Sequence, residues 1–188
     1  MKLLIASDLH GSASMAQKMV DVFKEEQADY LFLLGDTLYH GPRNPLPEGY
    51  NPAEVIEILN AMSDRIISIR GNCDSEVDQK MLKFPLTADY QVFPLEGRKL
   101  FATHGHLFDP TPDLSQTPDY LVAGDIFAFG HVHLPFLEVN EKGVLVLNPG
   151  SLTIPRGGHP ATYAVMTGSE IQIKTLDGKV YRDLSVTL

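Results

Sequence analysis

The sequence predicts an α/β fold in which two β-sheets pack face to face with helices outside them. The first half alternates between apolar runs and segments of helical spacing, in the order strand, helix, strand, helix, strand. From about residue 90, short apolar segments follow one another with turns between them. The chain has 188 residues, which is enough to bury a substantial core. We therefore expect one domain that spans residues 1–188.

The first strand is expected at residues 2–7, where an apolar run ends too early to be the core of a signal peptide. A helix should follow over residues 15–27, because apolar residues recur there at helical spacing. Ser12 or Ser14 is placed to cap this helix. A second strand is expected at residues 30–35, which are apolar without alternation. Such a run is typical of a strand covered on both faces, as in a parallel sheet.

Residues 40–52 are rich in Pro and Gly, and this composition predicts a loop. Residues 52–62 form an amphipathic pattern with Pro at its start, as expected of a second helix. A third buried strand is expected at residues 65–72. The second half should then add eight short strands, at residues 90–96, 99–106, 126–133, 135–141, 143–151, 161–168, 170–178 and 179–186. Turn residues at 141–143 and 177–178 predict hairpins within this series.

Composition and charge exclude several classes of protein. The single cysteine, Cys73, excludes an internal disulfide and favours a reducing compartment, so we expect a cytoplasmic protein. No apolar stretch approaches the ~18–20 residues that cross a bilayer. The formal net charge of −9 argues against general nucleic-acid binding, which depends on Lys and Arg. A phosphate substrate stays compatible with this charge, because a metal ion can supply positive charge locally.

Polar side chains gather where the predicted strands end, and in α/β sheets ligands bind at that edge. Three pairs have i, i+2 spacing, which in extended chain places both side chains on one face. A lone histidine at a strand end is more often structural than a ligand, but five successive clusters favour a metal site. The candidate donors are Asp8, His10, Asp36, Asn72, His104, His131 and His133.

These donors mix carboxylate, imidazole and amide groups. Such a set suits Mn²⁺, Fe²⁺, Zn²⁺ or Co²⁺ better than Ca²⁺ or Mg²⁺, which prefer oxygen. Seven side chains are too many for one metal with an open position, but they suffice for two if one carboxylate bridges. Two metals ~3.5–4 Å apart are a recurring arrangement for the hydrolysis of phosphate esters.

The five clusters resemble, in order, the five motifs of the calcineurin-like metallophosphoesterase superfamily. The likeness extends from residue 1 to about residue 165, and the stretches "HGPRN", "GNCDSEVDQ", "THGHLF" and "NPGS" also resemble small bacterial phosphodiesterases of the YfcE type. The resemblance implies two mixed β-sheets in a sandwich flanked by helices, as four layers. It also implies a dinuclear site, commonly assayed with Mn²⁺, and hydrolysis of a small phosphodiester substrate. Ni²⁺, Co²⁺, Zn²⁺ and Fe²⁺ are the other candidate metals.

Carried over to this sequence, the resemblance assigns Asp36 as the carboxylate that bridges two metals. The first metal would be held by Asp8, His10, Asp36 and His133, and the second by Asp36, Asn72, His104 and His131. A hydroxide shared by both metals would be the nucleophile, because metal coordination lowers the pKa of water from 15.7 toward ~7.

Further residues are weaker candidates. His106 resembles the second histidine of a family motif and would contact phosphate, orient a ligand or serve the structure. Arg43 lies in the Pro-rich loop and would bind substrate phosphate bidentately, unless it is a solvated arginine or lies at a subunit contact. Asp74 is expected to fix the loop of Asn72 by hydrogen bonds. Residues 148–151 are interpreted as a turn without a chemical role. The candidate catalytic residues are thus Asp36, Asn72, Cys73 and His106, with Arg43 as a substrate-binding residue.

Cys73 stands where many members of the superfamily have a histidine that serves as the acid for the leaving group. Near two cations its thiol should have a lowered pKa, and a thiolate cannot donate a proton. We expect weak general-acid assistance and a preference for diesters with good leaving groups.

Two other functions compete with a phosphodiesterase. One is a binding scaffold, because a eukaryotic retromer subunit shares the implied fold but has an altered site. Here every expected donor position is filled, which favours an enzyme. The other is a phosphomonoesterase or protein phosphatase. A homo-oligomer is compatible with the resemblance.

Overall fold

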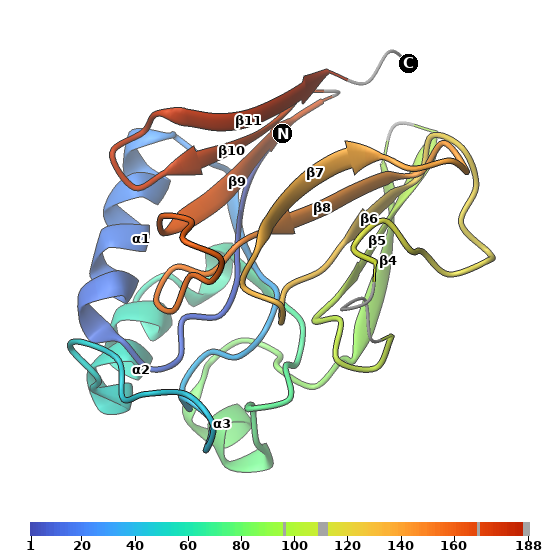
Figure 1. Cartoon of the computed structure of the whole chain (residues 1–188). Coiled ribbons are helices and arrows are strands. Elements are labelled where there is room, and N and C mark those ends of the chain that lie inside the picture. The colour runs from blue at the N-terminus through green and yellow to red at the C-terminus, as the bar shows by residue number, and fades with distance from the viewer. Residues whose placement is uncertain (96, 109–112, 169, 186–188) are drawn as a thin grey trace.

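Two mixed β-sheets form the framework of the molecule, as predicted (Figure 1). The computed structural model describes residues 1–95, 97–108, 113–168 and 170–185. One sheet has six strands in the order β11-β10-β9-β1-β2-β3, and the other has five in the order β4-β5-β6-β8-β7. The strands are β1 (Lys2–Ala6), β2 (Tyr30–Leu33), β3 (Ile66–Ser68), β4 (Tyr90–Leu95), β5 (Arg98–Thr103), β6 (Ile126–Ala128), β7 (Pro135–Val139), β8 (Leu145–Pro149), β9 (Thr162–Thr167), β10 (Glu170–Thr175) and β11 (Val180–Ser185).

Both predicted helices are present, and two shorter ones were missed. Helices α1 (Ala13–Glu25) and α2 (Pro52–Asn60) lie close to their expected ranges, and Ser12 caps α1 by accepting a hydrogen bond from the backbone N–H of Met15. The 3₁₀ helix η1 (Ser63–Arg65) and helix α3 (Glu76–Met81) were not predicted. Each has fewer than seven residues, which is too short for a helical pattern to show. No helix among the described residues is long and apolar enough to cross a membrane.

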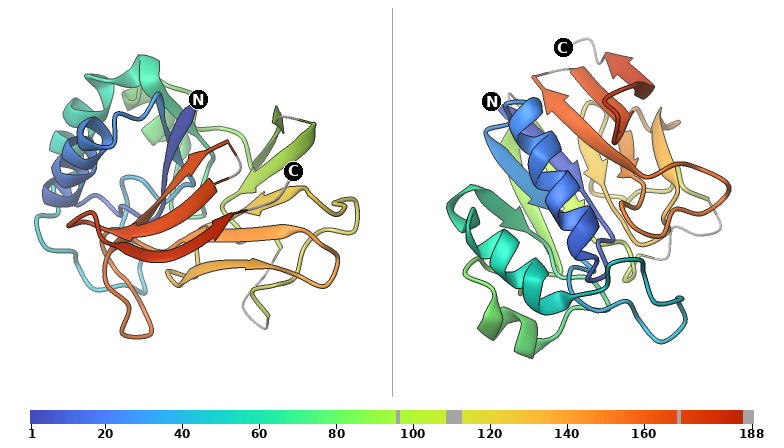
Figure 2. Two further views of the ribbon diagram at one scale, coloured as in Figure 1. Left: turned by 90° about the horizontal axis from the view of Figure 1, so that it is seen from above. Right: turned by 90° about the vertical axis from the view of Figure 1, so that its left-hand side faces the viewer.

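The core has three parts that correspond to the layers. Helices α1 and α2 pack on the outer face of the six-stranded sheet through residues such as Met19 and Val55 (Figure 2). A second cluster fills the space between the sheets, where Ile5 and Phe32 share one cluster with Leu147. A third covers the outer face of the five-stranded sheet, and Leu121 belongs to it. The loop that contains Leu121 covers this outer face, and none of the described helices lies in that cluster.

Parallel strands in both sheets bring their carboxyl ends to one edge. In the six-stranded sheet, β1, β2 and β3 are neighbouring parallel strands, and in the five-stranded sheet β5, β6 and β8 are. The sheets meet at this edge, because the backbone N–H of His131 after β6 donates to Asp8 after β1 at 3.0 Å. The polar clusters of five strands therefore face one another, as the sequence predicts. The two hairpins expected at residues 141–143 and 177–178 are also present, between β7 and β8 and between β10 and β11.

Candidate metal centre

The candidate ligands lie on unusual backbone. Six non-glycine residues in the described ranges have a positive φ, and five of them are candidate ligands. Such left-handed conformations cost roughly 1–3 kcal/mol each and persist where the surrounding structure enforces them. The sixth, Gln27, follows the end of α1. The five candidate ligands are Asp8 (57°), His10 (49°), Asp36 (54°), His131 (66°) and His133 (60°).

This backbone corrects one premise of the sequence analysis. The i, i+2 pairs were expected to share a face because the chain is extended, but Asp8, His10, His131 and His133 are left-handed. Asp8 and His10 therefore come together because the chain turns sharply after β1, and the turn after β6 directs His131 and His133 to different groups. Only Asp8 and His10 share a group: His131 and His133 belong to different groups, and His106 belongs to none among the described residues.

The side chains converge in two groups with Asp36 between them. In the first group, Nε2 of His133 lies 3.1 Å from Oδ1 of Asp8 and 3.2 Å from Nε2 of His10. The ligand atoms of these three residues lie within 4.8 Å of one another, and the same holds for Asp36, His104 and His131.

Asn72 joins the second group, and Asp36 reaches both. Nε2 of His104 lies 3.2 Å from Oδ1 of Asn72 and 3.4 Å from Oδ1 of Asp36. The other Asp36 oxygen, Oδ2, lies 3.8 Å from Nε2 of His10 in the first group. All seven predicted donors are thus brought together, with the bridging candidate at the centre.

In three of the histidines, the ring nitrogen that points away from the other ligands, Nδ1, is hydrogen-bonded to a backbone carbonyl. Nδ1 of His10 is 2.9 Å from the oxygen of Tyr39, Nδ1 of His104 is 2.6 Å from that of Leu34, and Nδ1 of His133 is 2.6 Å from that of Ile154. A carbonyl accepts only, so Nδ1 must carry a proton, and in the neutral ring Nε2 then presents a lone pair inward. This arrangement is typical of metal-binding histidines.

Asp8 supplies the test of whether a cation fits. The side chain is fully buried, and its Oδ1 accepts no hydrogen bond from any described residue when Nε2 of His133, 3.1 Å away, is the unprotonated nitrogen of that ring. A buried carboxylate oxygen without a donor is costly. A divalent cation among Asp8, His10 and His133 would satisfy this oxygen and the inward lone pairs together. The residues present therefore fit a metal site.

The charged groups of the site shift the pKa values of one another. Burial by itself would raise the pKa of Asp8, but the imidazoles of His133, His104 and His10 hold it below its usual value. Burial would lower the pKa of His104, yet the carboxylates of Asp36 and Asp8 raise it to about 9. Burial and the neighbouring His104 lower the pKa of His131 to about 4. The carboxylates of Asp36 and Asp8 thus favour positive charge at His104, as a proton or as a metal ion, whereas burial and His104 outweigh them at His131.

Asp74 fixes the loops after β2 and β3, as the sequence predicts. Its carboxylate accepts hydrogen bonds from the backbone N–H groups of Asp36 (2.8 Å), Thr37 (2.7 Å) and Gly71 (2.7 Å). Burial raises the pKa of Asp74 to about 6, and the bonds from Thr37 and Gly71 act against this rise. The backbone N–H of Cys73 in turn donates to Asp36 at 2.8 Å. A Cβ at position 71 would collide with Asp36, so only glycine allows this approach.

Residues 148–151 have a role that the sequence analysis missed. The segment is not a free turn, because Asn148 and Pro149 end strand β8. Nδ2 of Asn148 donates to the carbonyl of Gly130 at 2.7 Å, and Oγ of Ser151 donates to the carbonyl of Asp8 at 2.9 Å. These side chains therefore hold the loops after β6 and β1. Small polar residues directly after an apolar strand were the only available signal.

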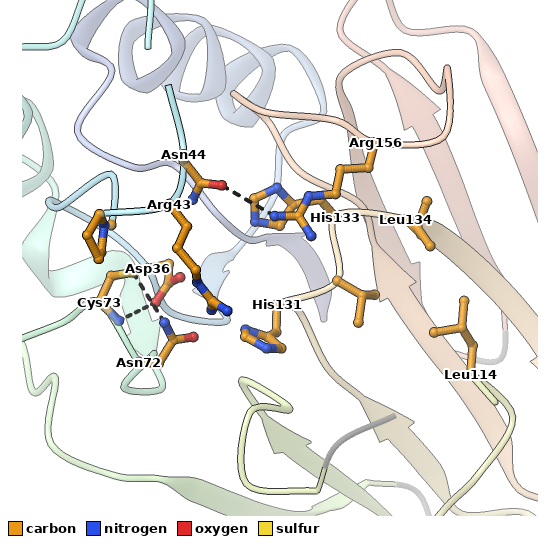
Figure 3. Close-up of a pocket in the computed structure, with 13 residues that line it drawn as sticks. Asp36, Arg43, Asn44, Asn72, Cys73, Leu114, His131, His133, Leu134 and Arg156 are labelled. Atoms are coloured by element: carbon orange, nitrogen blue, oxygen red, sulfur yellow. Dashed lines mark hydrogen bonds between the residues drawn. The ribbon is translucent and has the colours of Figure 1, made fainter. Parts of the chain in front are cut away.

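A cavity of about 730 Å³ opens beside the candidate ligands. Arg43 lines it and points toward Asp36, Asn72 and His131, so the arginine reaches the site (Figure 3). Arg156, which the sequence analysis did not select, lines it as well. Its short segment carries no chemical motif, and only the fold brings it to the site.

His106 and Cys73 lie differently. The ring of His106 is 5.5 Å from that of His104, between centroids, and Nδ1 of His106 is buried without a partner among the described residues. His106 is absent from the described lining of the cavity. Cys73 lines the cavity, and its Sγ accepts a hydrogen bond from Nδ2 of Asn72 at 3.3 Å. Burial and then Asp36 raise the pKa of the Cys73 thiol. The expected lowering depends on bound cations, and the protein groups alone act in the opposite direction.

Comparisons with known proteins agree with this geometry. A family model described as "Calcineurin-like phosphoesterase superfamily domain" matches residues 1–170. The chain is 46% identical over 179 residues to "Phosphodiesterase YfcE" of Escherichia coli K12, covering 94% of this chain and 93% of that one. It is 30% identical over 173 residues to "Probable metallophosphoesterase YsnB" of Bacillus subtilis, covering 89% and 84%. A solved structure described as Yfce, a phosphoesterase from E. coli, matches with a TM-score of 0.90 at 42% identity and covers all of both chains.

Proposed function

Because the chain belongs to the calcineurin-like phosphoesterase superfamily, we propose that it is a phosphoric diester hydrolase with a dinuclear metal site. One observation carries the proposal: two groups of ligand atoms, most of them buried, converge on the two sides of Asp36, beside a cavity of about 730 Å³. The likeness to a named phosphodiesterase supports the diester as the substrate. A cavity of this volume accommodates a small organic diester.

The ligands divide around the bridging carboxylate. One ion would be held by Asp8, His10 and His133 together with Asp36. The other would be held by Asn72, His104 and His131, again with Asp36. The mixed donors favour a transition metal, with Mn²⁺ as the first candidate and Ni²⁺, Co²⁺, Zn²⁺ or Fe²⁺ as alternatives.

The bound ions would supply Lewis acidity and lower the pKa of the water that they share, which gives a hydroxide nucleophile at neutral pH. Hydrolysis then forms one bond from the water oxygen to phosphorus and breaks the bond to the leaving oxygen, which takes up a proton. Arg43 would hold the phosphoryl oxygens from the cavity side, because a guanidinium binds phosphate bidentately. The carbonyls behind His10, His104 and His133 keep those rings in one tautomer, so no reorganisation is needed when a ligand arrives.

Cys73 lies in the cavity, close to the reacting atoms. A thiol whose Sγ lies beside Asn72 and within 4.8 Å of an Asp36 oxygen, and whose pKa is raised, is a poor source of a proton for the leaving group. We expect the rates of a series of aryl diesters to fall steeply as the leaving-group pKa rises, and Cys73→His to make that dependence shallower. A dependence that is shallow in the native enzyme, or that the substitution leaves unchanged, would contradict this role.

The direct test is hydrolysis of bis-p-nitrophenyl phosphate by metal-stripped protein with and without added Mn²⁺. The proposal expects turnover that depends on the metal and a lower kcat/KM for the monoester p-nitrophenyl phosphate. Background rates with Mn²⁺, Co²⁺, Ni²⁺ and Zn²⁺ alike would replace the enzyme with a binding scaffold of the same fold. A strong preference for the monoester would replace it with a phosphomonoesterase.

The remaining expectations stay predictions. A scaffold does not need a complete set of donors, so the seven donors here favour an enzyme. A cytoplasmic location and a homo-oligomer are still predicted from the single cysteine and from the family resemblance. A nucleic-acid partner is not expected, because the net charge is −9.

A further inference from the structure

Two arginines line the cavity from different parts of the chain. Arg43 belongs to the loop after β2, and Arg156 to the segment between β8 and β9. Within the described ranges, neither forms an ion pair with a carboxylate, although the chain carries 24 acidic residues against 15 basic ones. Two guanidinium groups facing one cavity without a carboxylate partner indicate a site for more than one anionic group.

Arg156 is held in place by hydrogen bonds to His133 and to Asn44. Its backbone N–H donates to the carbonyl of His133 at 3.1 Å, so its position follows that of a candidate ligand. Its Nη2 donates to Oδ1 of Asn44 at 3.3 Å, and Nδ2 of Asn44 donates to the carbonyl of His40 at 2.8 Å. A guanidinium has five N–H donors, and only one is used in this contact. The side chain is thus oriented before a ligand binds, while most of its donors stay free.

The two arginines serve different places in the cavity. The guanidinium of Arg43 lies toward Asp36, Asn72 and His131, where a scissile phosphate would sit (Figure 3). The guanidinium of Arg156 lies beside Asn44 and His133, away from Asn72 (Figure 3). A phosphate held between the two metal groups therefore leaves Arg156 available for a second group.

We infer that Arg156, positioned by Asn44, binds a second anionic group on one arm of the phosphodiester substrate, an inference that rests on the proposed function. The preferred substrate class is a diester that carries a phosphate or carboxylate beyond the bond that is cut. The other wall of the cavity is apolar and includes Leu114, Val132 and Leu134, so the uncharged arm would pack there.

A pair of chromogenic substrates tests the inference. Thymidine 5′-(p-nitrophenyl phosphate) and its 3′-phosphorylated derivative share the scissile bond and the p-nitrophenol leaving group, and only the second carries an additional anion. With Mn²⁺ present, the native enzyme should show a kcat/KM about tenfold higher for the 3′-phosphorylated substrate, as expected for one charge-assisted contact. Arg156→Ala should bring the ratio of the two values close to one, and Arg156→Lys should retain part of it.

The matched control is Arg65, which is exposed on η1 and lies outside the cavity lining. Arg65→Ala should keep the full ratio of the two kcat/KM values.

The outcomes separate this inference from the function on which it rests. Hydrolysis of neither substrate by the native enzyme would overturn the phosphodiesterase. Hydrolysis of both with equal kcat/KM, or a preference that survives in Arg156→Ala, would overturn the anion-binding role of Arg156 and leave the phosphodiesterase standing. Because the conclusions about Arg156 use a ratio within one preparation, a partly unfolded variant does not alter them.

Discussion

The loops that carry the candidate ligands and the loops that form the cavity mouth differ in how far their functional side chains are exposed. We call the segments after β1, β2, β3, β5 and β6 the ligand loops, and residues 40–51 and 153–160 the mouth loops. In the ligand loops, Asp8, His10 and His104 are at most 1% exposed, and each is tied by hydrogen bonds to another segment. In the mouth loops, Arg43 and Arg156 are exposed. A side-chain bond of 3.3 Å, from Arg156 to Asn44, joins the two mouth loops.

The comparison indicates that the two sets of loops carry different properties of the enzyme. Strained, buried and multiply bonded loops suit groups that must keep a fixed geometry. Exposed loop side chains tolerate change, and substrate preference often lies in such segments. Substitutions in the ligand loops should therefore abolish metal binding or stability, and substitutions in the mouth loops should alter substrate binding.

The largest effect is expected from Asp36→Asn, in the ligand loops. The substitution removes the negative charge that both metal groups share, so both ions should be lost and kcat/KM should fall by at least about 100-fold. Metal content by mass spectrometry and hydrolysis of bis-p-nitrophenyl phosphate would check this. Asp64→Asn, at an exposed position on η1, is the control. Native metal content together with a native rate would contradict the bridging role.

A large loss of stability is expected from Asp74→Asn. The native carboxylate accepts three backbone N–H groups, and the amide has one acceptor oxygen, so at least one buried donor loses its partner. We expect the free energy of unfolding to fall by about 2–3 kcal/mol, with weaker metal binding. Urea unfolding in the presence and absence of Mn²⁺ measures both. Unchanged stability would show that the loops after β2 and β3 do not depend on this carboxylate.

A smaller effect is expected in the mouth loops from Arg43→Ala. If Arg43 contacts the scissile phosphate, kcat/KM should fall about tenfold, as for the loss of one charge-assisted hydrogen bond, while metal content stays native. Arg43→Lys should recover only part of the rate, because an ammonium is not bidentate. A parallel fall in metal content would place Arg43 with the ligand loops and contradict the division drawn between them.

The smallest effect is expected from Ser151→Ala. Oγ of Ser151 donates to the carbonyl of Asp8 and accepts from the backbone N–H of Ile154, whose carbonyl faces His133. The substitution should lower the free energy of unfolding by about 1 kcal/mol and leave measurable activity. Ser63→Ala, at a half-exposed position in η1, is the matched control in thermal unfolding. Equal melting temperatures for the two variants would remove Ser151 from the supports of the site.

The ligand loops were largely predictable from the sequence, whereas in the mouth loops only the loop at residues 40–52 and its Arg43 were predicted. Candidate donors such as Asp36 and His104 follow apolar strands directly, and parallel strands end at a common edge. The left-handed backbone of Asp8 and His10 was not predictable, because non-glycine residues rarely adopt it without tertiary support. Arg156 was missed because its contact, Asn44, lies 112 residues away in the sequence. Exposed loops carry no periodic pattern from which such contacts follow.

The central claim is that two metal ions share Asp36, with Asp8, His10 and His133 on one side and Asn72, His104 and His131 on the other. Anomalous scattering from crystals grown with Mn²⁺ tests it most directly. We predict two peaks ~3.5–4 Å apart, each within bonding distance of Asp36 and of its own three residues. A single peak, or two peaks of which one does not contact Asp36, would contradict the account.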